Sequence, residues 1–589
     1  MPRSNAEVAA AFRELADLTE IAGGDRFRVL AYRRVADAVS GLGREITTLS
    51  DAELVALRGV GKGTAPKIRE LLASGSMAQL EQMRAAVPAG VHELTRLSGL
   101  GPKKALVIVR ELGVSTLDEL RAAIDAHRLR DLPGLGAKTE ENLLAALAAY
   151  RPTEERILLS QALRLAEEML EILRHGPAIE RCSYAGSLRR MRETIGDLDL
   201  LAASAEPAAA MEAFSRLPQV ARVAARGSTK SSVVTHDGVQ VDLRVVAPDE
   251  WGAALQYFTG SKEHNVKVRE HAVKHGFKLS EYGLFRVGRR GEAAPSTDAE
   301  RVAAETEEEV YSALGMQTPP PTLRENRGEV ELALRGELPV LVEVSDLRGD
   351  LQSHSTYSDG RVPLEEMARA AAERGYAYFA VTDHGRNLRL PGMRSLSLED
   401  IDRQAAEVRR LNETLGGGMH LLHGVELNIG PDGDLDYPDE ILSRFDAVVA
   451  SVHHNMKDDR ETMTRRILRA IDNPNVNIIG HPTGRRIGRR PAYELDLEAI
   501  ARTAAAHGVA LEINANPQRL DLKDDHILLA REVGCPLVIS TDAHSPRELG
   551  LMRFGVATAQ RGWVTKEEVI NTWPRERLLR FLARGRARR

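Results

Sequence analysis

The chain has 589 residues, enough for about three to five domains, and its 80 Lys and Arg nearly cancel its 85 Asp and Glu. Hydrophobic residues at 43% and charged residues at 28% are typical of globular proteins and exclude a disordered or fibrous chain. The chain has only two cysteines, and no apolar run approaches the roughly 18 residues of a membrane span. It also shows no signal-peptide core, so we expect a cytoplasmic protein without a membrane partner. The net charge of −5 alone argues against a nucleic-acid partner.

The pattern of apolar residues changes along the chain. Residues 1–150 show helical spacing throughout, and residues 151–175 continue as one predicted helix. Short β-rich runs follow between residues 182 and 247, and then a helix is predicted over 262–276. Pro319–Pro321 marks the sharpest boundary, because three prolines disfavour both helix and central strand. After it, apolar strands alternate with helices, which predicts a parallel sheet or barrel of βα units.

One short unit, Leu-x-Gly-[Val/Leu]-Gly, recurs three times in the helical part, each time before a helix with Lys near its start. The glycines permit a tight turn, and exposed N–H groups beside a helix N-terminus form an anion site. A single copy fits an ordinary connection between helices equally well, but three copies favour binding to a phosphate backbone. The residues are Gly59, Gly61 and Lys62; Gly99, Gly101 and Lys103; and Gly134, Gly136 and Lys138. The unit resembles the helix-hairpin-helix motif of DNA repair proteins.

Three carboxylates lie in the strand-like runs of the middle part. On a strand, Asp197 and Asp199 share one face about 7 Å apart, and Asp242 lies in another run with apolar neighbours. Like charges this close repel unless cations lie between them, and three convergent carboxylates suit two Mg²⁺ ions for phosphoryl transfer. Gly186–Ser187 and Arg190 offer donors for a triphosphate. A solvated strand face is the alternative for a lone Asp-x-Asp.

The segments GSLRRMRETIGDLDLL, VDLRVV and LQYFTGSKEHN resemble the palm and thumb of a family X DNA polymerase. The resemblance implies that Asp197, Asp199 and Asp242 hold two Mg²⁺ or Mn²⁺ ions, and that dNTPs are the substrates. It also implies a set of nucleotide-binding residues: Gly186, Ser187, Arg190, Gly196, Arg156, Tyr257, Phe258, Gly260 and Asn265.

The N-terminal segments FRVLAYRRVADAV and LRGVGKGTAPKIRELLASG are similar to the small lyase domain of the same family. The resemblance places the Schiff-base lysine of that family at Lys67. A nucleophilic lysine must be partly deprotonated, which burial or neighbouring cations such as Lys62 favour. A lysine that only contacts phosphate is the alternative, because Gly63 and Arg28 stand where lyase-active relatives carry lysines.

Histidines and carboxylates follow most of the apolar runs in the last part of the chain, where the active sites of βα barrels form. One such histidine is usually structural, but a set at equivalent strand ends indicates a metal site. The set resembles a PHP domain, a distorted βα barrel that binds up to three metal ions and hydrolyses phosphate esters. The resemblance implies Mn²⁺ or Zn²⁺ ions, with Glu426 bridging, and these ligands: His354, Asp359, His384, Glu426, His453, His481, Asp542 and His544.

The first segment of that family normally reads D-x-H-x-H, and here Gln352 replaces the first histidine. A carboxamide is a weaker ligand than imidazole for Zn²⁺ and is better tolerated by Mn²⁺. We therefore expect Mn²⁺-dependent 3′→5′ exonuclease or related 3′-end phosphoesterase activity from the barrel.

Taken together, the motifs predict a repair DNA polymerase that fills short gaps, acting as a cytoplasmic, nucleoid-associated monomer on gapped or nicked duplex DNA. Positive charge gathers locally at the three hairpins and at Arg189–Arg192. The distribution of positive charge therefore favours DNA binding, although the net charge does not. The alternatives are a hydrolase in which only the barrel is active, a template-independent nucleotidyltransferase, and a DNA-end-binding scaffold.

The predicted fold is multidomain: an all-α helix-hairpin-helix region, an α+β nucleotidyltransferase palm with a thumb, and a C-terminal distorted βα barrel of PHP type. The expected boundaries are 1–82 for a lyase-like domain, 83–150 for a fingers-like domain, 151–256 for the palm, 257–318 for the thumb, 319–345 for a linker and 346–589 for the barrel.

Overall fold

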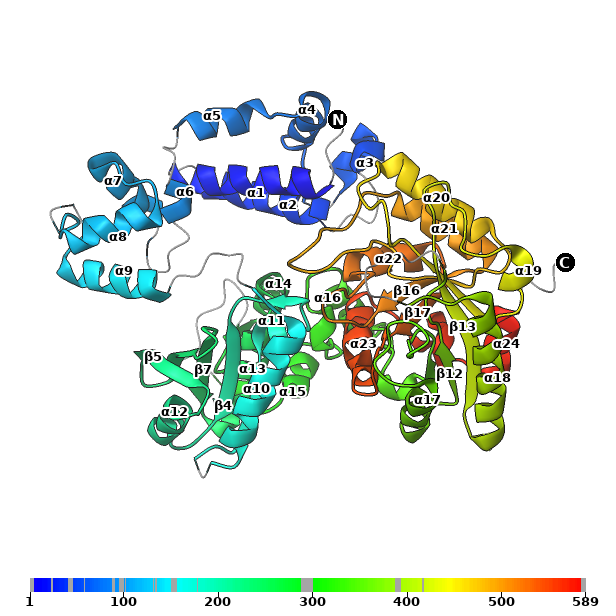
Figure 1. Cartoon of the computed structure of the whole chain (residues 1–589). Coiled ribbons are helices and arrows are strands. Elements are labelled where there is room, and N and C mark those ends of the chain that lie inside the picture. Colours follow the sequence, from blue (N-terminus) through cyan, green and yellow to red (C-terminus); the bar gives the residue numbers. More distant parts are fainter. Residues whose placement is uncertain are drawn as a thin grey trace. The chain divides into compact units, whose positions relative to one another are not determined.

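The computed structural model divides the chain into two compact units, Met1–Glu155 and Arg156–Arg589, which we describe separately (Figure 1). It describes residues 5–583 apart from 23–24, 41–45, 58, 87–90, 95–99, 101, 131, 133–134, 150–155, 177, 288–299, 387–393 and 416–417.

The first unit is helical over its described residues, which confirms the all-α prediction, and the apolar positions of its helices share one core. Two of its helices begin at capping boxes, formed by Ser50 with Glu53 and by Thr116 with Glu119. The helices are α1 (Asn5–Ile21), α2 (Arg26–Ser40), α3 (Asp51–Ala56), α4 (Ala65–Ser74), α5 (Ala78–Ala86), α6 (Val91–Leu94), α7 (Pro102–Leu112), α8 (Leu117–Asp125) and α9 (Ala137–Ala149).

The second unit begins with a five-stranded sheet in the order β2-β4-β7-β6-β5. Strands β4 and β7 are parallel, the other pairs are antiparallel, and α10 packs against the sheet. The elements are α10 (Leu159–Arg174), β2 (Arg181–Tyr184), α11 (Gly186–Arg189), β4 (Leu198–Ala203), α12 (Pro207–Ser215), β5 (Val220–Arg226), β6 (Lys230–Thr235) and β7 (Gln240–Val246).

The helix predicted over 151–175 begins later than expected, at Leu159. The two residues before it form β1 (Ile157–Leu158) and pair with β3 (Thr194–Ile195). The Leu158 N–H donates to the side chain of Gln161, and the Leu159 N–H donates to the carbonyl of Glu193. The chain therefore enters α10 from a strand that lies beside the loop carrying Asp197.

The next segment packs three helices against a small antiparallel sheet. Its elements are α13 (Trp251–Thr259), α14 (Lys262–Lys274), β8 (Phe277–Ser280), β9 (Gly283–Arg286), β10 (Arg301–Ala303) and α15 (Glu307–Ala313). Residues 319–345, expected as a linker, contain α16 (Glu329–Arg335) and the fully buried Arg324. Arg324 donates 2.5 Å to Glu307, so this segment is packed onto the thumb.

Seven parallel strands, β11 to β17 in chain order, form the C-terminal sheet, and helices surround it (Figure 1). A bridge between Ser353 and Ala543, just beyond β11 and β17, brings the first and last strands together and nearly closes the barrel. The strands are β11 (Gly349–Asp350), β12 (Tyr378–Val381), β13 (His420–Asn428), β14 (Ala447–Ser451), β15 (Ile478–Ile479), β16 (Ala510–Asn514) and β17 (Leu537–Ser540). The helices are α17 (Leu364–Glu373), α18 (Leu398–Thr414), α19 (Asp439–Leu442), α20 (Arg460–Asp472), α21 (Leu497–His507), α22 (Asp524–Glu532), α23 (Met552–Arg561) and α24 (Arg575–Leu582).

No helix among the described residues is both long and apolar enough to span a membrane.

A buried ion network joins the palm, the end of the thumb and the barrel within the second unit. Arg561 on α23 donates 2.9 Å to Glu325 and 2.7 Å to the main-chain carbonyl of Arg190. Through its other terminal nitrogen it donates 2.6 Å to Asp524. Each carboxylate has a second guanidinium partner, Arg190 for Glu325 at 3.1 Å and Arg327 for Asp524 at 3.2 Å. The side chain of Arg561 is 5% exposed, so its charge is compensated inside the protein.

Replacing Arg561 by Met is expected to lower the free energy of unfolding of the second unit by about 3 kcal/mol. The substitution keeps most of the aliphatic stem but leaves two mostly buried carboxylates short of cationic partners. Urea unfolding followed by tryptophan fluorescence measures this loss, because all three tryptophans lie in the second unit. The matched control is Arg553→Met on the same helix, where the pair with Glu167 is 46% exposed on both sides and should contribute less than about 1 kcal/mol. Equal losses for the two variants would contradict a buried network.

Candidate active sites

The carboxylates of the palm converge because β4 and β7 run parallel in register. Asp199 and Asp242 are direct partners across these two strands. The turn that leads into α11 approaches them at Gly186, whose φ is +58°. A Cβ at this position would clash with the Asp199 carboxylate. Glycine is therefore required here both for its backbone angle and for the close approach of the Gly186–Ser187 turn to the carboxylates.

Asp197 differs from its expected position on a strand. It lies in a bend one residue before β4 and is exposed, because the strand begins only at Leu198. The simple alternation that would place Asp197 and Asp199 on one strand face therefore does not apply. Asp197 is still close enough to Asp199 for its charge to act on that carboxyl group.

The palm carboxylates have the electrostatics of a cation site. Burial, together with the charges of Asp197 and Asp242, raises the pKa of Asp199 to about 7. Lys230 on the neighbouring strand lies 2.6 Å from Asp242, and Gln240 donates 3.0 Å to the same carboxylate. The carboxylates thus repel one another, and one of them already pairs with an ammonium group. Such a site favours divalent cations between the carboxylate oxygens.

Two predicted triphosphate contacts, Arg156 and Arg190, hold loops of the palm in place. Arg156 donates 2.9 Å to the hydroxyl and 2.6 Å to the carbonyl of Thr194, and its guanidinium lies against Gly196. Arg190 donates 3.1 Å to Glu325 and 2.6 Å to the carbonyl of Thr259, which leaves Nη2 without a partner among the described residues. Both guanidinium groups are thus fixed beside the carboxylates.

The predicted nucleotide-lining residues come together at the end of α13 and the start of α14. The rings of Tyr257 and Phe258 meet edge to face at 5.2 Å. Asn265 donates 2.7 Å to the carbonyl of Tyr257 and accepts 2.8 Å from Gln256. Gly260, with φ of +68°, lies against the Arg190 guanidinium. The hydrogen bond from Arg190 to the carbonyl of Thr259, the residue after Phe258, fixes the aromatic pair relative to the palm loop.

Glu426 lies at the centre of the histidine cluster in the barrel. It is fully buried on β13. Its Oε1 is 3.1 Å from His481 Nε2 and 3.3 Å from His453 Nε2, and its Oε2 is 3.3 Å from His384 Nδ1 and 3.5 Å from His354 Nε2. Burial raises the pKa of Glu426, but the histidines outweigh it and hold this pKa well below the usual value. An ionised carboxylate with both oxygens among imidazoles suits a bridge between cations.

The other predicted ligands complete the cluster. His354 Nε2 is 3.0 Å from Asp542, and His544 Nε2 is 3.0 Å from Asp359. Three groups have ligand atoms within 4.8 Å of one another: His354, Asp359, His384 and His544; His384, Glu426 and His453; and His354, Glu426 and Asp542. The structure thus brings all eight predicted ligands to one end of the barrel.

The unpartnered atoms of this cluster fit metal ions. Nδ1 of His453 and Nδ1 of His481 are buried and make no hydrogen bond within the described structure, and the buried Nδ1 of His354 and His384 and Oε1 of Glu426 contact only other members of the cluster. Burial also lowers the pKa of His384 to about 3, so its imidazole is neutral at neutral pH and offers the lone pair of one ring nitrogen to a metal ion. His481 and Asp542 have φ of +27° and +55°, a strained backbone that occurs most often at functional sites.

Two residues near the cluster were missed by the sequence motifs. Glu512 on β16 is fully buried, accepts 2.5 Å from the His481 N–H, and has its Oε1 unpartnered. Arg519 lies 3.7 Å from Asp542. A carboxylate inside an otherwise apolar strand is the signal that could have indicated Glu512. Gln352, which replaces the expected histidine, is also fully buried with both amide atoms unpartnered.

The first and third glycine hairpins have the same backbone hydrogen bonds. In the first, Val60 donates 3.0 Å to Leu57 and Thr64 donates 2.9 Å to Gly61; in the third, the equivalent bonds are 3.1 Å and 2.8 Å. Gly59 has φ of +100° and would clash with Arg34 if it carried a Cβ. A Cβ at Gly61 or Gly136 would meet nothing within 4 Å, so the backbone there is open to a ligand.

Some predicted DNA-contacting residues lie outside the described part of the chain, namely Gly99, Gly101 and Gly134 and the side chain of Lys103. Lys62 and Lys138 are exposed beside their hairpins. Lys67 is half-buried on the first turn of α4, behind the first hairpin.

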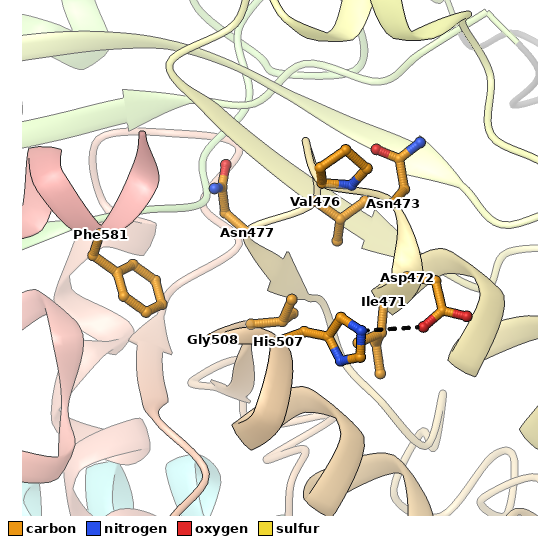
Figure 2. A pocket seen from close by; sticks show the side chains of 10 residues that line it. Ile471, Asp472, Asn473, Val476, Asn477, His507, Gly508 and Phe581 are labelled. Carbon is orange, nitrogen blue, oxygen red and sulfur yellow. Dashed lines mark ion pairs between the residues drawn. The ribbon is translucent and has the colours of Figure 1, made fainter. Parts of the chain in front are cut away.

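A pocket at the opposite end of the barrel strands does not involve any predicted site residue (Figure 2). Asn477 and Val509, which line it, come directly before β15 and β16, whereas the metal ligands follow the strands. His507 and Asp472 face each other there 3.4 Å apart. The chemistry-bearing residues thus gather at the carboxyl end of the sheet, as in other βα barrels.

Comparison with known protein families assigns the parts of the chain. A helix-hairpin-helix domain family matches residues 3–77, and a SAM-like helix-hairpin-helix tandem matches 91–149. The DNA polymerase beta thumb matches residues 254–325, and the PHP domain matches 350–516.

One relative matches nearly the whole chain. The DNA polymerase/3′-5′ exonuclease PolX of Bacillus subtilis (strain 168) is 38% identical over 568 residues, which is 96% of this chain and 97% of that protein. This chain belongs to the family X DNA polymerases with a C-terminal PHP domain. As a family X polymerase it depends on divalent metal ions and binds DNA. Because the match covers the helical region and the thumb as well as the barrel, the alternative of a hydrolase in which only the barrel is active has no support.

The barrel of this family X polymerase also has separate relatives. A probable phosphatase of Thermoanaerobacter sp. (strain X514) is 32% identical over 235 residues, 38% of this chain and 89% of that protein. A probable phosphatase of Shewanella sediminis (strain HAW-EB3) is 31% identical over 231 residues, 38% of this chain and 87% of that protein.

Proposed function

We propose that this chain extends a primer across short gaps in duplex DNA from its palm, and removes nucleotides from 3′ ends in its barrel. The pairing of Asp199 with Asp242 across β4 and β7, with the Gly186–Ser187 turn packed against them, carries the first assignment. The buried cluster around Glu426 carries the second. The Bacillus subtilis relative is named for both activities.

In the palm, the primer 3′-hydroxyl attacks the α-phosphate of a dNTP; the new P–O bond replaces the bond to pyrophosphate, which leaves. Asp197, Asp199 and Asp242 would hold Mg²⁺ or Mn²⁺ ions, which would neutralise negative charge and favour ionisation of the hydroxyl. The Gly186 and Ser187 N–H groups, the Ser187 hydroxyl and Arg190 Nη2 bind the triphosphate. Tyr257 and Phe258 then pack against the sugar.

In the barrel, water attacks the terminal phosphodiester, and the bond to the shortened strand breaks to release a nucleoside monophosphate. The three ligand groups in the barrel cluster suit up to three ions, which would activate the attacking water and stabilise the charge on phosphoryl oxygens. The amide oxygen of Gln352 lies close to Gly480, the residue before the candidate ligand His481, and we propose Mn²⁺ rather than Zn²⁺ there. Arg519 is placed to face the negative phosphate.

We propose that the open backbone at Gly61 and Gly136, with Lys62 and Lys138, binds phosphates of the duplex on either side of a gap. Lys67 stays a predicted lyase nucleophile. Borohydride trapping on DNA with an abasic site decides its role: a covalent adduct that is lost in Lys67→Ala supports the lyase, and its absence in the unmodified chain leaves Lys67 as a phosphate contact.

The raised pKa of Asp199 predicts a pH dependence of nucleotide incorporation. With the pKa at about 7, the carboxyl group holds a proton below pH 7 in the metal-free palm, and a metal ion must displace it. At limiting Mg²⁺ we therefore expect the single-turnover rate to fall about tenfold per pH unit below pH 7 and to level off above it. Raising the Mg²⁺ concentration should shift this midpoint to lower pH. A midpoint independent of Mg²⁺ would contradict the assignment of Asp199 as a ligand.

A further inference from the structure

The loop after β15 carries four arginines in six residues, 485–490, which we call the arginine hairpin. Arg486 and Arg490 exchange two main-chain hydrogen bonds of 2.8 Å, which close the turn. Positive φ angles occur at Gly484, just before the hairpin (59°), and at Gly488 within it (73°). The polymerase and nuclease motifs do not account for this segment.

One side of the arginine hairpin is anchored on the palm. Arg485 lies 2.8 Å from Glu193, which is four residues before Asp197. Ile487 packs against the hydrophobic core of the palm, and its N–H donates 2.7 Å to the carbonyl of Gln518. The hairpin is therefore held between the loop of the polymerase site and the barrel.

The other side of the arginine hairpin reaches the barrel cluster through Arg519. The Arg519 side chain is 12% exposed and lies 3.7 Å from the metal-ligand candidate Asp542. Arg519 directly follows Gln518, whose carbonyl accepts the 2.7 Å hydrogen bond from Ile487 in the hairpin. This main-chain bond joins the hairpin to the segment that carries Arg519, so the arginines extend from Glu193 in the palm to the edge of the metal site.

Three of the four arginines in the hairpin have no carboxylate partner among the described residues. Across the described residues, no carboxylate lies within ion-pair distance of Arg486, Arg489 or Arg490, whereas most arginines of the barrel helices are paired. Arg486 and Arg489 are exposed. Guanidinium forks match the geometry of phosphate oxygens, and a row of them suits a chain of phosphates better than a single anion.

We propose that the arginine hairpin and Arg519 bind the phosphodiester backbone of a single DNA strand and lead its 3′ end from the palm into the barrel metal site. This inference rests on the proposed nuclease function of the barrel. The strand would run from the loop after β3, past Arg489 and Arg486, to Arg519 and the ligands beyond it.

The test uses the full chain with Arg486→Gln and Arg489→Gln combined. Its kcat/KM with Mn²⁺ is measured on a labelled single-stranded oligonucleotide and on bis(4-nitrophenyl) phosphate, a diester too small to reach the hairpin. We expect the ratio of the two values to fall about 10- to 100-fold in the variant. The slope of log kcat/KM for the oligonucleotide against log salt should shrink by about 1.4, since single strands lose about 0.7 per phosphate contact.

The matched control is Arg369→Gln with Arg502→Gln, which makes the same charge change at exposed arginines of α17 and α21. Its substrate ratio should stay within about twofold of the unmodified chain, the scatter expected for surface changes. An unchanged ratio in the hairpin variant, or an equal fall in the control, would overturn the inference.

A second measurement separates this inference from the nuclease assignment. An oligonucleotide with 4-thiothymidine near its 3′ end is photo-crosslinked to the unmodified chain without metal, and the modified peptides are mapped. Cross-links at 485–490 or at Arg519 support strand binding, and cross-links confined to other segments overturn it. If the unmodified chain hydrolyses neither substrate, the nuclease proposal fails, and the cross-link map still decides the binding proposal.

Discussion

Replacing Asp197 and Asp199 together by Ala is expected to reduce nucleotide incorporation on a gapped duplex by at least about 10³-fold. Asp199 is paired in register with Asp242, so its loss removes half of the cross-strand carboxylate pair, and Asp197 is the exposed member of the trio. Without them the triphosphate and the primer hydroxyl have no shared cations to align them. Single-turnover extension of a labelled primer measures the effect.

The matched control for the palm is Asp237→Ala, an exposed carboxylate in the turn between β6 and β7. It removes a charge from the same sheet without touching the predicted site, and incorporation should change by less than about twofold. Extension that survives in the Asp197/Asp199 variant, or that proceeds without a template in the unmodified chain, would contradict the polymerase assignment.

Replacing Glu426 by Gln is expected to reduce Mn²⁺-dependent degradation of 3′ ends by at least about 10²-fold. Glu426 belongs to two of the three ligand groups, and its two oxygens contact four histidines. The amide has the same shape but one oxygen and no charge, so it cannot bridge two cations. Nuclease assays measure the rate, and elemental analysis of the purified chain should show fewer bound metal ions.

The control for the barrel is Glu440→Gln, an exposed residue on α19 with the same chemical change. Its metal content and nuclease rate should match those of the unmodified chain. Unaltered metal content in the Glu426 variant would contradict the central place of this carboxylate in the cluster.

Residue patterns predicted that the candidate ligands of the barrel lie together, because the ends of apolar strands are visible in a sequence. Each of His384, His453 and His481 follows an apolar run, and parallel strands bring their carboxyl ends to one edge. The sequence also showed that Gln352 replaces the expected histidine, but it did not show that this side chain is completely buried.

In the palm, the arrangement of the carboxylates and one edge strand could not be predicted from the residue pattern. The spacing of Asp197 and Asp199 suggested one strand face, but the strand begins at Leu198. The cross-strand partner of Asp199 is Asp242, 43 residues away in the sequence, through the register of β4 and β7. The exposed edge strand β5, with an Ala- and Arg-rich sequence, gave no clear periodicity.

Long-range ion pairs were the least predictable feature. Nothing in the sequence around Arg561 indicates that its guanidinium holds Glu325 and the carbonyl of Arg190, residues that precede it by more than two hundred positions. The same holds for Arg519 beside Asp542 and for Arg485 beside Glu193. Such contacts depend on how the palm and the barrel pack together within the second unit.

The central claim is that one chain carries two independent active sites. The direct test follows a 5′-labelled primer on a gapped duplex with dNTPs and Mn²⁺ for the unmodified chain, the Asp197→Ala/Asp199→Ala variant and the Glu426→Gln variant. We expect the first variant to shorten the primer without extending it, and the second to extend the primer without shortening it. Loss of both activities in either variant, or extension by the first, would contradict two separate sites.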